Sequence, residues 1–415
     1  MLIQDGPEAL RRFVALPTDT LIVLGARRCP PIASPLPNSD TQVGLFTSVG
    51  FSSISADYYA TAAQKLQPDI VVGLADIAFG PEPVGRKRKF KMSDRTESWL
   101  EALVGTSRTS QAGSDRACSI FAPILPIDRD LQSWYLEHLV DAMLAHVSGV
   151  AIYDAFLLDD LPEALHHLPR LSLHPPASPH ELLRHIGLGV DMCTVPFLTD
   201  ATDAGIALDF TFPAPPQHHF TIDRHSLGVD LWSDAHAVAV TPLSCGCVCY
   251  ACTKHHRAYL QHLLAAKEML GWVLIQLHNH AMLSAFFAGI RSSIEAGTFA
   301  SDVAAFEAYY EPALPEKTGQ GPRMRGYQFK SEAHANREKK NPKAFRVFSE
   351  DEIARLRAAH GQQSHKMPVM SDGVDDEALF GLVDMPPLHS DGSPVLGVDL
   401  LNLNNNRASS VDGGE

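Results

Sequence analysis

"SCGCVCYACTKHHRAYLQHLL", residues Ser244–Leu264, is the stretch that decides how the second half of this chain folds. The chain has seven cysteines, and four of them lie within the first nine residues of this stretch. Cys247, Cys249 and Cys252 form the pattern C-x-C-x-x-C, from which three thiolates can converge on one cation. An odd number of clustered cysteines argues against a disulfide framework. The pattern therefore predicts a metal site, with buried or incidental thiols as the simpler alternative.

The fourth ligand of such a site must come from elsewhere in the chain. The sequence predicts a helix over Lys254–Gly271, followed by a strand over Trp272–Leu277 with His278 at its end. A helix that leads away from the cysteines, followed by a strand that runs back, would bring His278 close to them. Cys245 is the alternative fourth ligand. Because four protein ligands leave no position open for a substrate or water, a filled site of this kind is structural.

The first half of the chain alternates short β-branched or aromatic runs with amphipathic stretches. This alternation predicts parallel strands covered by helices, and the length suits a closed (β/α)8 barrel of the TIM type. Only seven strands can be counted, so either one strand is unrecognised or the chain begins after the usual first strand of the barrel. The expected strands are Thr20–Gly25, Val43–Val49, Asp69–Leu74, Ser119–Pro126, Gly149–Asp154, Arg170–His174 and Gly189–Pro196. The helices expected between them are Ala56–Leu66, Ser93–Val104, Leu131–His146 and Pro179–Ile186, and residues 203–240 are expected to form an inserted β-rich stretch.

Composition predicts three parts along the chain. Residues 1–300 are expected to form the barrel and to include the cysteine segment, at 241–285. Residues 301–365 are expected to form a C-terminal extension with one short helix, over Ser349–His360. Residues 366–415, which are acidic and rich in Gly, Ser and Asn, are predicted to be disordered.

Charge is unevenly distributed in this chain, whose formal net charge is −14. A compact basic run over Arg86, Lys87, Arg88 and Lys89 is the candidate for contact with nucleic acid phosphates, and a solvated loop is the alternative. No run of 18 uninterrupted apolar residues is found, which predicts that no segment spans a membrane. The amino-terminal residues lack the order of a secretory signal.

The segment "CVCYACTKHHRAYLQHLLAAKEMLGWVLIQLHNH" resembles the zinc segment of the tRNA-guanine transglycosylases, or queuine tRNA-ribosyltransferases. Members of that family carry C-x-C-x-x-C, an R-A-Y-L-x-H-L helix and a strand that ends in His-Asn. The resemblance implies that His278 is the fourth ligand and that each subunit holds one structural Zn²⁺. It also implies a (β/α)8 barrel with a late zinc insertion. Weaker similarity extends over residues 15–300.

Active members of the family use one Asp to attack the ribose C1′ and a second Asp to move protons. Where the family's nucleophile strand reads G-[IV]-D-[ML]-F-D-C-V, this chain reads "GVDMCTVPF". Asp191 matches the first Asp, and Thr194 stands in the place of the nucleophile. The counterpart of T-D-S-G-G-F-Q is "FTSVGFSS", in which Thr47 or Ser48 replaces the second Asp. Asp76 is the candidate for the base-binding Asp of the family, with an ordinary loop Asp as the alternative.

Loss of both carboxylates with a retained zinc segment resembles the non-catalytic branch of the family, the accessory subunits 2. The resemblance implies no catalytic residue in this chain and a heterodimer with a catalytic subunit, to which Arg257–Leu270 would contribute. The pair would place queuine at wobble position 34 of tRNAs with GUN anticodons. It also implies a cytoplasmic location, with peripheral association at the mitochondrial outer membrane, and a homodimer when the chain is alone.

Two other functions compete with this interpretation. The first is a self-sufficient transglycosylase that uses Asp191 as its nucleophile. The second is a zinc-stabilised homodimer that binds queuine or acts as a scaffold.

Overall fold

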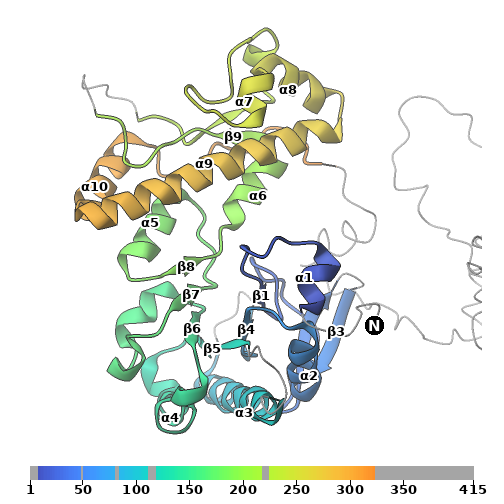
Figure 1. The fold of residues 1–415 in the computed structure, drawn as a ribbon, viewed down its shortest axis with the longest axis vertical. Helices are drawn as coiled ribbons and strands as arrows, with labels where there is room; N and C mark the ends of the chain where they lie inside the picture. The colour runs from blue at the N-terminus through green and yellow to red at the C-terminus, as the bar shows by residue number, and fades with distance from the viewer. Residues whose placement is uncertain (1–7, 48–49, 80–83, 111–117, 217–223, 323–415) are drawn as a thin grey trace, which may run out of the picture. The chain divides into compact units, whose positions relative to one another are not determined.

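Six of the seven expected strands pair into one parallel sheet (Figure 1). The computed structural model describes residues 8–47, 50–79, 84–110, 118–216 and 224–322. The sheet order is β1-β4-β5-β6-β7-β8, so each strand lies beside the next parallel strand of the chain. The predicted α/β class with a parallel sheet is confirmed. The strands are β1 Val23–Leu24, β4 Ile70–Val72, β5 Ser119–Ile124, β6 Gly149–Ile152, β7 Arg170–Ser172 and β8 Met192–Cys193.

The two end strands of this sheet approach each other at their carboxyl ends. Within the described ranges no ladder joins β1 to β8, so a closed eight-stranded barrel is not seen there. However, the thiol of Cys29, which follows β1, lies 3.2 Å from the hydroxyl of Thr194, which follows β8. The sheet is therefore strongly curved. At its amino ends an open cavity of about 990 Å³ is lined in part by Leu21, Asp69 and Arg170.

The expected strand over Val43–Val49 is not part of the parallel sheet, which corrects the strand count. It forms β2 (Gln42–Thr47), which pairs antiparallel with β3 (Gly50–Ser55) in a separate hairpin. Gly50 has φ 112°, a conformation that a side chain would strain, and this allows the sharp return of the chain. Val43 and Leu45 are both buried and lie two residues apart, a spacing that fits a hairpin strand as well as a barrel strand.

Helices cover the sheet on its outer face (Figure 1). α2 has the expected bounds, and α5 ends one residue later than expected. Each helix is preceded by a serine whose hydroxyl accepts a hydrogen bond from a backbone N–H of the first turn. The expected helix over Leu131–His146 is divided into α4, a π turn over Leu139–Met143 and a 3-10 turn over Leu144–His146. The helices of this half are α1 Ala9–Val14, α2 Ala56–Leu66, α3 Arg86–Ser110, α4 Ser133–His138 and α5 Pro179–Gly187.

Both faces of the inner strands β4, β5 and β6 are buried, which explains their continuous apolar sequence. Val71 and Val150 point into the large core under the helices. Ile70, Val72 and Phe121 point to the concave face, where they form a smaller cluster.

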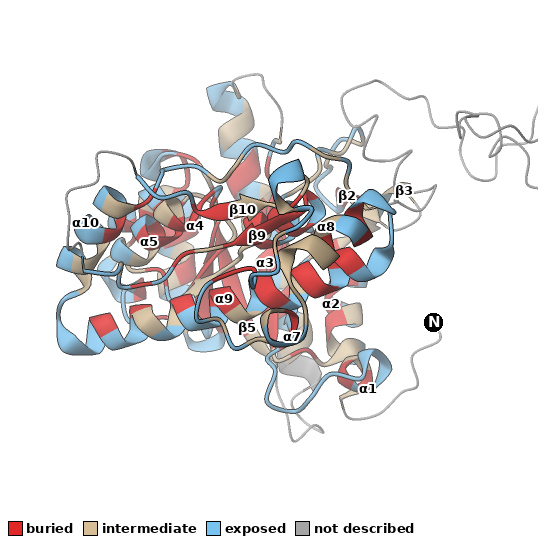
Figure 2. Ribbon diagram, turned by 90° about the horizontal axis from the view of Figure 1, so that it is seen from above, coloured by how far each residue is buried: buried red, intermediate tan, exposed pale blue. Residues whose placement is uncertain are grey.

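The second half of the chain is organised around one long helix, α9 (Met269–Ala296), which carries buried residues on one face (Figure 2). As expected from the β-rich stretch over residues 203–240, a short antiparallel pair forms there. The pair and the helices packed with α9 are β9 Ile206–Leu208, β10 Gly228–Asp230, α6 Pro196–Asp203, α7 Tyr250–Lys254, α8 Arg257–Ala265 and α10 Phe299–Tyr309.

The expected strand over Trp272–Leu277 is wrong, because these residues are helical and belong to α9. Trp272, Ile275 and His278 are buried at helical spacing, whereas Val273 and Leu277 are half exposed. An apolar run of six residues does not by itself distinguish a buried strand from a helix. Gly271 does not end a helix either. It lies inside α9, where a Cβ would meet the Cβ of Leu263 at 3.2 Å, so it permits close packing of α8 on α9.

α9 is also long and apolar enough to cross a membrane, judged by length and composition. Buried helices of soluble proteins meet the same criterion. The apolar residues toward its carboxyl end, including Met282, Phe286 and Ile290, are buried in a core shared with α6, β9 and α10. The predicted short helix over Ser349–His360 and the acidic tail at 366–415 lie outside the described residues, and the predicted domain boundaries stay predictions.

Candidate metal centre

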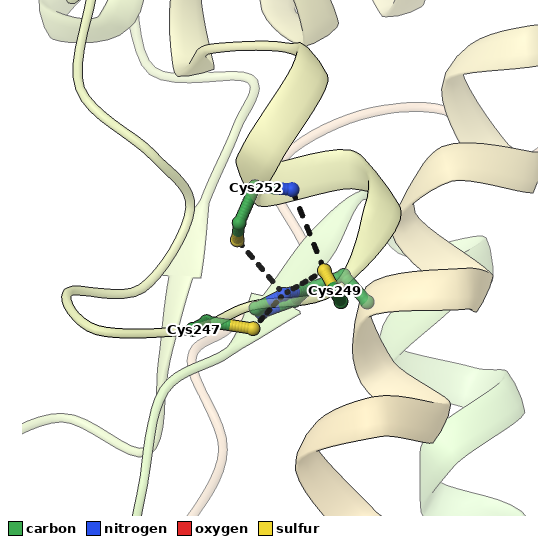
Figure 3. A group of neighbouring side chains, drawn as sticks. Cys247, Cys249 and Cys252 are labelled. Atoms are coloured by element: carbon green, nitrogen blue, oxygen red, sulfur yellow. Dashed lines mark hydrogen bonds between the residues drawn. The ribbon is translucent and has the colours of Figure 1, made fainter.

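Three cysteines and one histidine converge at the start of the helical second half (Figure 3). The Nδ1 atom of His278 lies 3.7 Å from Sγ of Cys247, 3.6 Å from Sγ of Cys249 and 3.4 Å from Sγ of Cys252. In a tetrahedral zinc site, bond lengths of about 2.3 Å to sulfur and about 2.05 Å to nitrogen place these atoms roughly 3.5 Å apart. The donor set and its spacing therefore fit a tetrahedral Zn²⁺-type cation.

The cysteines are presented by a tight turn that opens a short helix. Cys249 is the N-cap of α7, and its Sγ accepts the backbone N–H of Cys252 at 3.4 Å. Arg257, at the start of α8, donates to the carbonyl oxygens of Pro242 and Leu243 and so fixes the chain that leads into the turn. The first residues of α7 and α8 therefore fix the cysteine turn and the chain that leads into it.

His278 is fully buried, and its second nitrogen has a partner. Its Nε2–H donates to the carbonyl oxygen of Leu208 at 2.8 Å, which leaves Nδ1 unprotonated and directed at the three sulfurs. A backbone acceptor behind a histidine ligand is the usual way in which the tautomer of such a ligand is fixed. Burial lowers the pKa of His278, so the ring is neutral at neutral pH and able to bind a cation.

Burial also acts on the thiols of the cluster. It raises the pKa of Cys247 and raises the pKa of Cys252 to about 12. These two thiols are poor ligands and poor nucleophiles until a cation stabilises their thiolates. Cys245 is exposed and lies outside this group, so His278 rather than Cys245 completes the cluster.

Asn279 is a site residue for which no separate role was predicted. It is fully buried, its Oδ1 accepts the backbone N–H of Leu208, and its Nδ2 donates to Thr202 and to the carbonyl oxygen of Ile206. With the bond from His278, both the backbone N–H and the carbonyl oxygen of Leu208 are hydrogen-bonded to α9. The signal in the sequence was its position directly after the histidine ligand.

Thr194, in the place expected for a nucleophile, lies at the carboxyl edge of the sheet with its hydroxyl fully engaged. It donates to the carbonyl oxygen of Ser172 at 3.2 Å and accepts from the thiol of Cys29 at 3.2 Å. Burial raises the pKa of Cys29, which keeps that thiol protonated and able to donate. This contact could not be predicted, because the two residues are far apart in the chain.

The other positions of the expected catalytic motifs are not gathered around Thr194. Thr47 lies in the β2–β3 hairpin, where its hydroxyl donates to the carbonyl oxygen of Gly50 at 2.7 Å, and Ser48 lies outside the described residues. Asp191 precedes β8, at the opposite end of the strand from Thr194. Its Oδ2 accepts the backbone N–H of Arg170 at 2.8 Å.

Asp76, the candidate base-binding residue, is fully buried after β4 and is surrounded by donors. Arg88 binds both of its carboxylate oxygens at 2.6 Å, Arg95 donates at 3.1 Å and the amide of Asn38 donates at 2.6 Å. Burial would raise the pKa of Asp76, but the bonds from Arg88 and Asn38 outweigh it and lower the pKa overall. This carboxylate is saturated within the chain.

The basic run is the first turn of α3 rather than a loop. Arg86 and Lys87 are exposed, and the guanidinium of Arg86 lies over the ring of Phe90. Arg88 binds Asp76, as described above, and Nζ of Lys89 lies 3.5 Å from Asp128. Two of the four candidate residues are therefore turned to solvent, and two pair within the chain.

Comparisons with known proteins cover both the parallel sheet and the metal centre. A family described as queuine tRNA-ribosyltransferase matches residues 3–312. Queuine tRNA-ribosyltransferase accessory subunit 2 of Schizosaccharomyces pombe is 35% identical over 329 residues, which cover 79% of this chain and 72% of that protein. The protein of the same name from Drosophila mojavensis is 30% identical, over 69% of this chain and 70% of its own length. That of Xenopus laevis is 26% identical, over 71% and 79%.

Proposed function

Because the chain belongs to the queuine tRNA-ribosyltransferase family, we propose that it is a non-catalytic accessory subunit of that enzyme. In this role it supports a catalytic subunit that exchanges guanine for queuine at wobble position 34 of tRNAs with GUN anticodons. The observation that carries the proposal is the hydroxyl of Thr194, whose donor and acceptor roles are both taken up inside the chain. A neutral hydroxyl whose proton is donated to a backbone carbonyl oxygen is not an activated nucleophile. The names of the similar proteins support the same role.

The competing function, a self-sufficient enzyme with Asp191 as nucleophile, is disfavoured by position. Asp191 is at the amino end of β8, whereas barrel enzymes place their chemistry at the carboxyl ends of the strands. Its carboxylate also accepts a backbone hydrogen bond that starts β7.

Zinc is the cofactor of the proposed subunit, held by Cys247, Cys249, Cys252 and His278 in a structural role. Support comes from the sulfur–nitrogen distances and from the closed set of four protein ligands. When bound, the cation joins the cysteine turn to α9. We also propose that the curved parallel sheet represents part of a (β/α)8 barrel with the metal segment inserted late.

The interface with the catalytic subunit was expected at Arg257–Leu270. The surface now proposed begins at the end of that segment and continues along α9 as an apolar stripe, formed by Met269, Leu270, Val273 and Leu277. Their exposed fractions are 52%, 45%, 50% and 46%, and their spacing places them on one side of the helix. Val248 and Tyr250 of the cysteine turn are exposed as well. Contiguous exposed apolar side chains are typical of protein interfaces.

This surface can be tested with the full chain and the purified catalytic subunit. Val273→Asp places a charge in the stripe and is expected to weaken association at least tenfold, or about 1.4 kcal/mol. Ile294→Asp is the matched control, because Ile294 is 51% exposed on the same helix but outside the stripe. Equal affinity of the wild type and the Val273→Asp variant would contradict the interface. A wild-type chain that forms only homodimers through the stripe would favour the scaffold function instead.

The exposed residues of the basic run, Arg86 and Lys87, are proposed to contact tRNA phosphates. Reversal of both charges is expected to weaken tRNA binding by the complex and to reduce its salt slope by about 0.7–0.9 for each lost contact. Lys65→Glu, at an exposed position on α2, is the control. An unchanged salt slope would show that this run does not face RNA. A cytoplasmic location, with peripheral association at the mitochondrial outer membrane, completes the proposal.

A further inference from the structure

A second group of metal-ligand side chains lies at the carboxyl edge of the sheet, away from the cysteines. His174 follows β7, and Glu181 and His185 are one helical turn apart on α5. One ligand atom from each of the three lies within 4.8 Å of the others. The i, i+4 spacing on a helix directs two ligands to the same side, as in helical zinc motifs.

His185 is the observation that sets this group apart from an ordinary surface cluster. The residue is fully buried, and among the described residues neither ring nitrogen has a hydrogen-bond partner. A buried polar ring without partners is costly, because it has lost its hydrogen bonds to water. Its Nε2 lies 4.0 Å from Oε1 of Glu181, and its ring centre lies 4.9 Å from that of His174.

Protonation of His185 and an ion pair with Glu181 would be the simplest way to satisfy the ring. Burial lowers the pKa of His185, and the nearby His174 lowers it further, so the ring is neutral at neutral pH. A neutral imidazole that has a carboxylate oxygen and a second imidazole within 4.8 Å is instead a ligand for a cation.

The neighbouring groups are placed to support such a ligand set. Oε2 of Glu181 accepts the backbone N–H of Ala177 at 2.8 Å, which leaves Oε1 for the cation. Nδ1 of His174 lies 3.6 Å from Oδ1 of Asp154, an acceptor of the kind usually found behind a histidine ligand. Phe156 packs its ring against both imidazoles, at 5.8 and 5.9 Å, and limits the access of water.

Two adjustments accompany binding. Ligand atoms around tetrahedral zinc are roughly 3.3 Å apart, so the half-buried side chains of His174 and Glu181 must move closer to His185. Nδ1 of His174 also accepts the backbone N–H of Ala155 at 3.3 Å, so this bond must break before Nδ1 can carry a proton and donate it to Asp154.

From these contacts we propose that His174, Glu181 and His185 form a second binding site for a divalent Zn²⁺-type cation. Two histidines and one carboxylate leave a fourth position open, unlike the cysteine site, and this position would take water or an anionic oxygen. The proposal does not depend on the accessory function of the chain.

The test is a zinc count on the full chain after equilibrium dialysis against a fixed free zinc concentration. The wild type is expected to hold a second equivalent beyond the one bound by the cysteines. His174→Ala and Glu181→Gln are expected to lose that second equivalent and to keep the first, which also shows that they fold. These half-buried positions are used because a change at the buried His185 endangers folding. His146→Ala, at an exposed histidine outside both groups, is the control and should keep both equivalents.

Two results would overturn the proposal. One is a wild-type chain that binds a single equivalent. The other is a second equivalent that survives in His174→Ala, because that cation would be bound elsewhere.

Discussion

The cysteine turn and the carboxyl edge of the sheet are both built from residues far apart in the chain, yet they are completed in opposite ways. At the cysteine turn, three sulfurs and one nitrogen point at a common centre, and the groups behind them are satisfied by the backbone. At the sheet edge around Thr194 and Asp76, the polar side chains bind one another and the backbone. The ligand atoms of the first region face a centre that an ion can occupy, whereas the polar groups of the second region bind other groups of the chain.

This difference indicates which function each region has retained. A site that awaits a substrate needs polar groups that are held in place but not saturated. Thr194 and Asp76 do not meet that condition, whereas the four metal-ligand residues do for a cation. Three predictions test the contrast, in order of decreasing effect.

The largest effect is expected from Cys249→Ser. A hydroxyl is a weak ligand for zinc, and structural zinc supplies about 10 kcal/mol or more of folding free energy in small domains. The variant is therefore expected to lose its metal and to lose protection against hydrogen exchange in α7 and α8. Zinc content and exchange measured by mass spectrometry check this. Cys245→Ser, at the exposed cysteine, should change neither, and a stable, zinc-loaded Cys249→Ser chain would contradict the assignment.

An intermediate effect is expected from Asp76→Asn, because it leaves Arg88 and Arg95 without their buried anion. Breaking such a pair typically costs about 3 kcal/mol. The pKa of Asp76 is lowered in the folded chain, so its contribution is fully present above the unfolded value of about 3.9 and is lost as the pH falls through the folded value. Thermal melts should show a large difference at pH 7 that shrinks as the pH falls below about 4. A difference that does not depend on pH would show that the charge of Asp76 is not what matters.

The smallest effect is expected from Thr194→Val, which keeps the shape of the side chain and removes its hydroxyl. The carbonyl oxygen of Ser172 loses one donor, at a cost of about 1 kcal/mol. Base exchange by the complex with the catalytic subunit should be unchanged. A loss of exchange by orders of magnitude, with association intact, would mean that the hydroxyl takes part in the chemistry.

The metal ligands could be predicted from the sequence because local spacing fixes most of their geometry. Cys247, Cys249 and Cys252 lie within one turn, and only His278 had to be brought from a distance. The expected route for His278 was nevertheless wrong, since it lies inside α9 and not after a strand. Side chains at i, i+3 and i+4 of a helix can present a ligand as well as a strand end can, and a short apolar run does not distinguish the two.

The contacts that define the sheet edge could not be predicted. The bond from Cys29 to Thr194 joins residues on opposite end strands, so it depends on the curvature of the whole sheet. The pairing of Arg88 with Asp76 depends on α3 beginning at Arg86, earlier than the sequence predicted, which turns one residue of the basic run inward. Spacing along the chain carries no information on either contact.

The bonds from α9 to Leu208 have a consequence for the solubility of the metal-free chain. β9 pairs with β10 along one edge only, and on its other edge Asn279 and His278 occupy the backbone groups of Leu208. An uncovered strand edge is a template for pairing with a second molecule. A chelator that releases His278 would therefore uncover part of this edge, and precipitation through intermolecular strand pairing, not simple unfolding, is the expected fate of the chain.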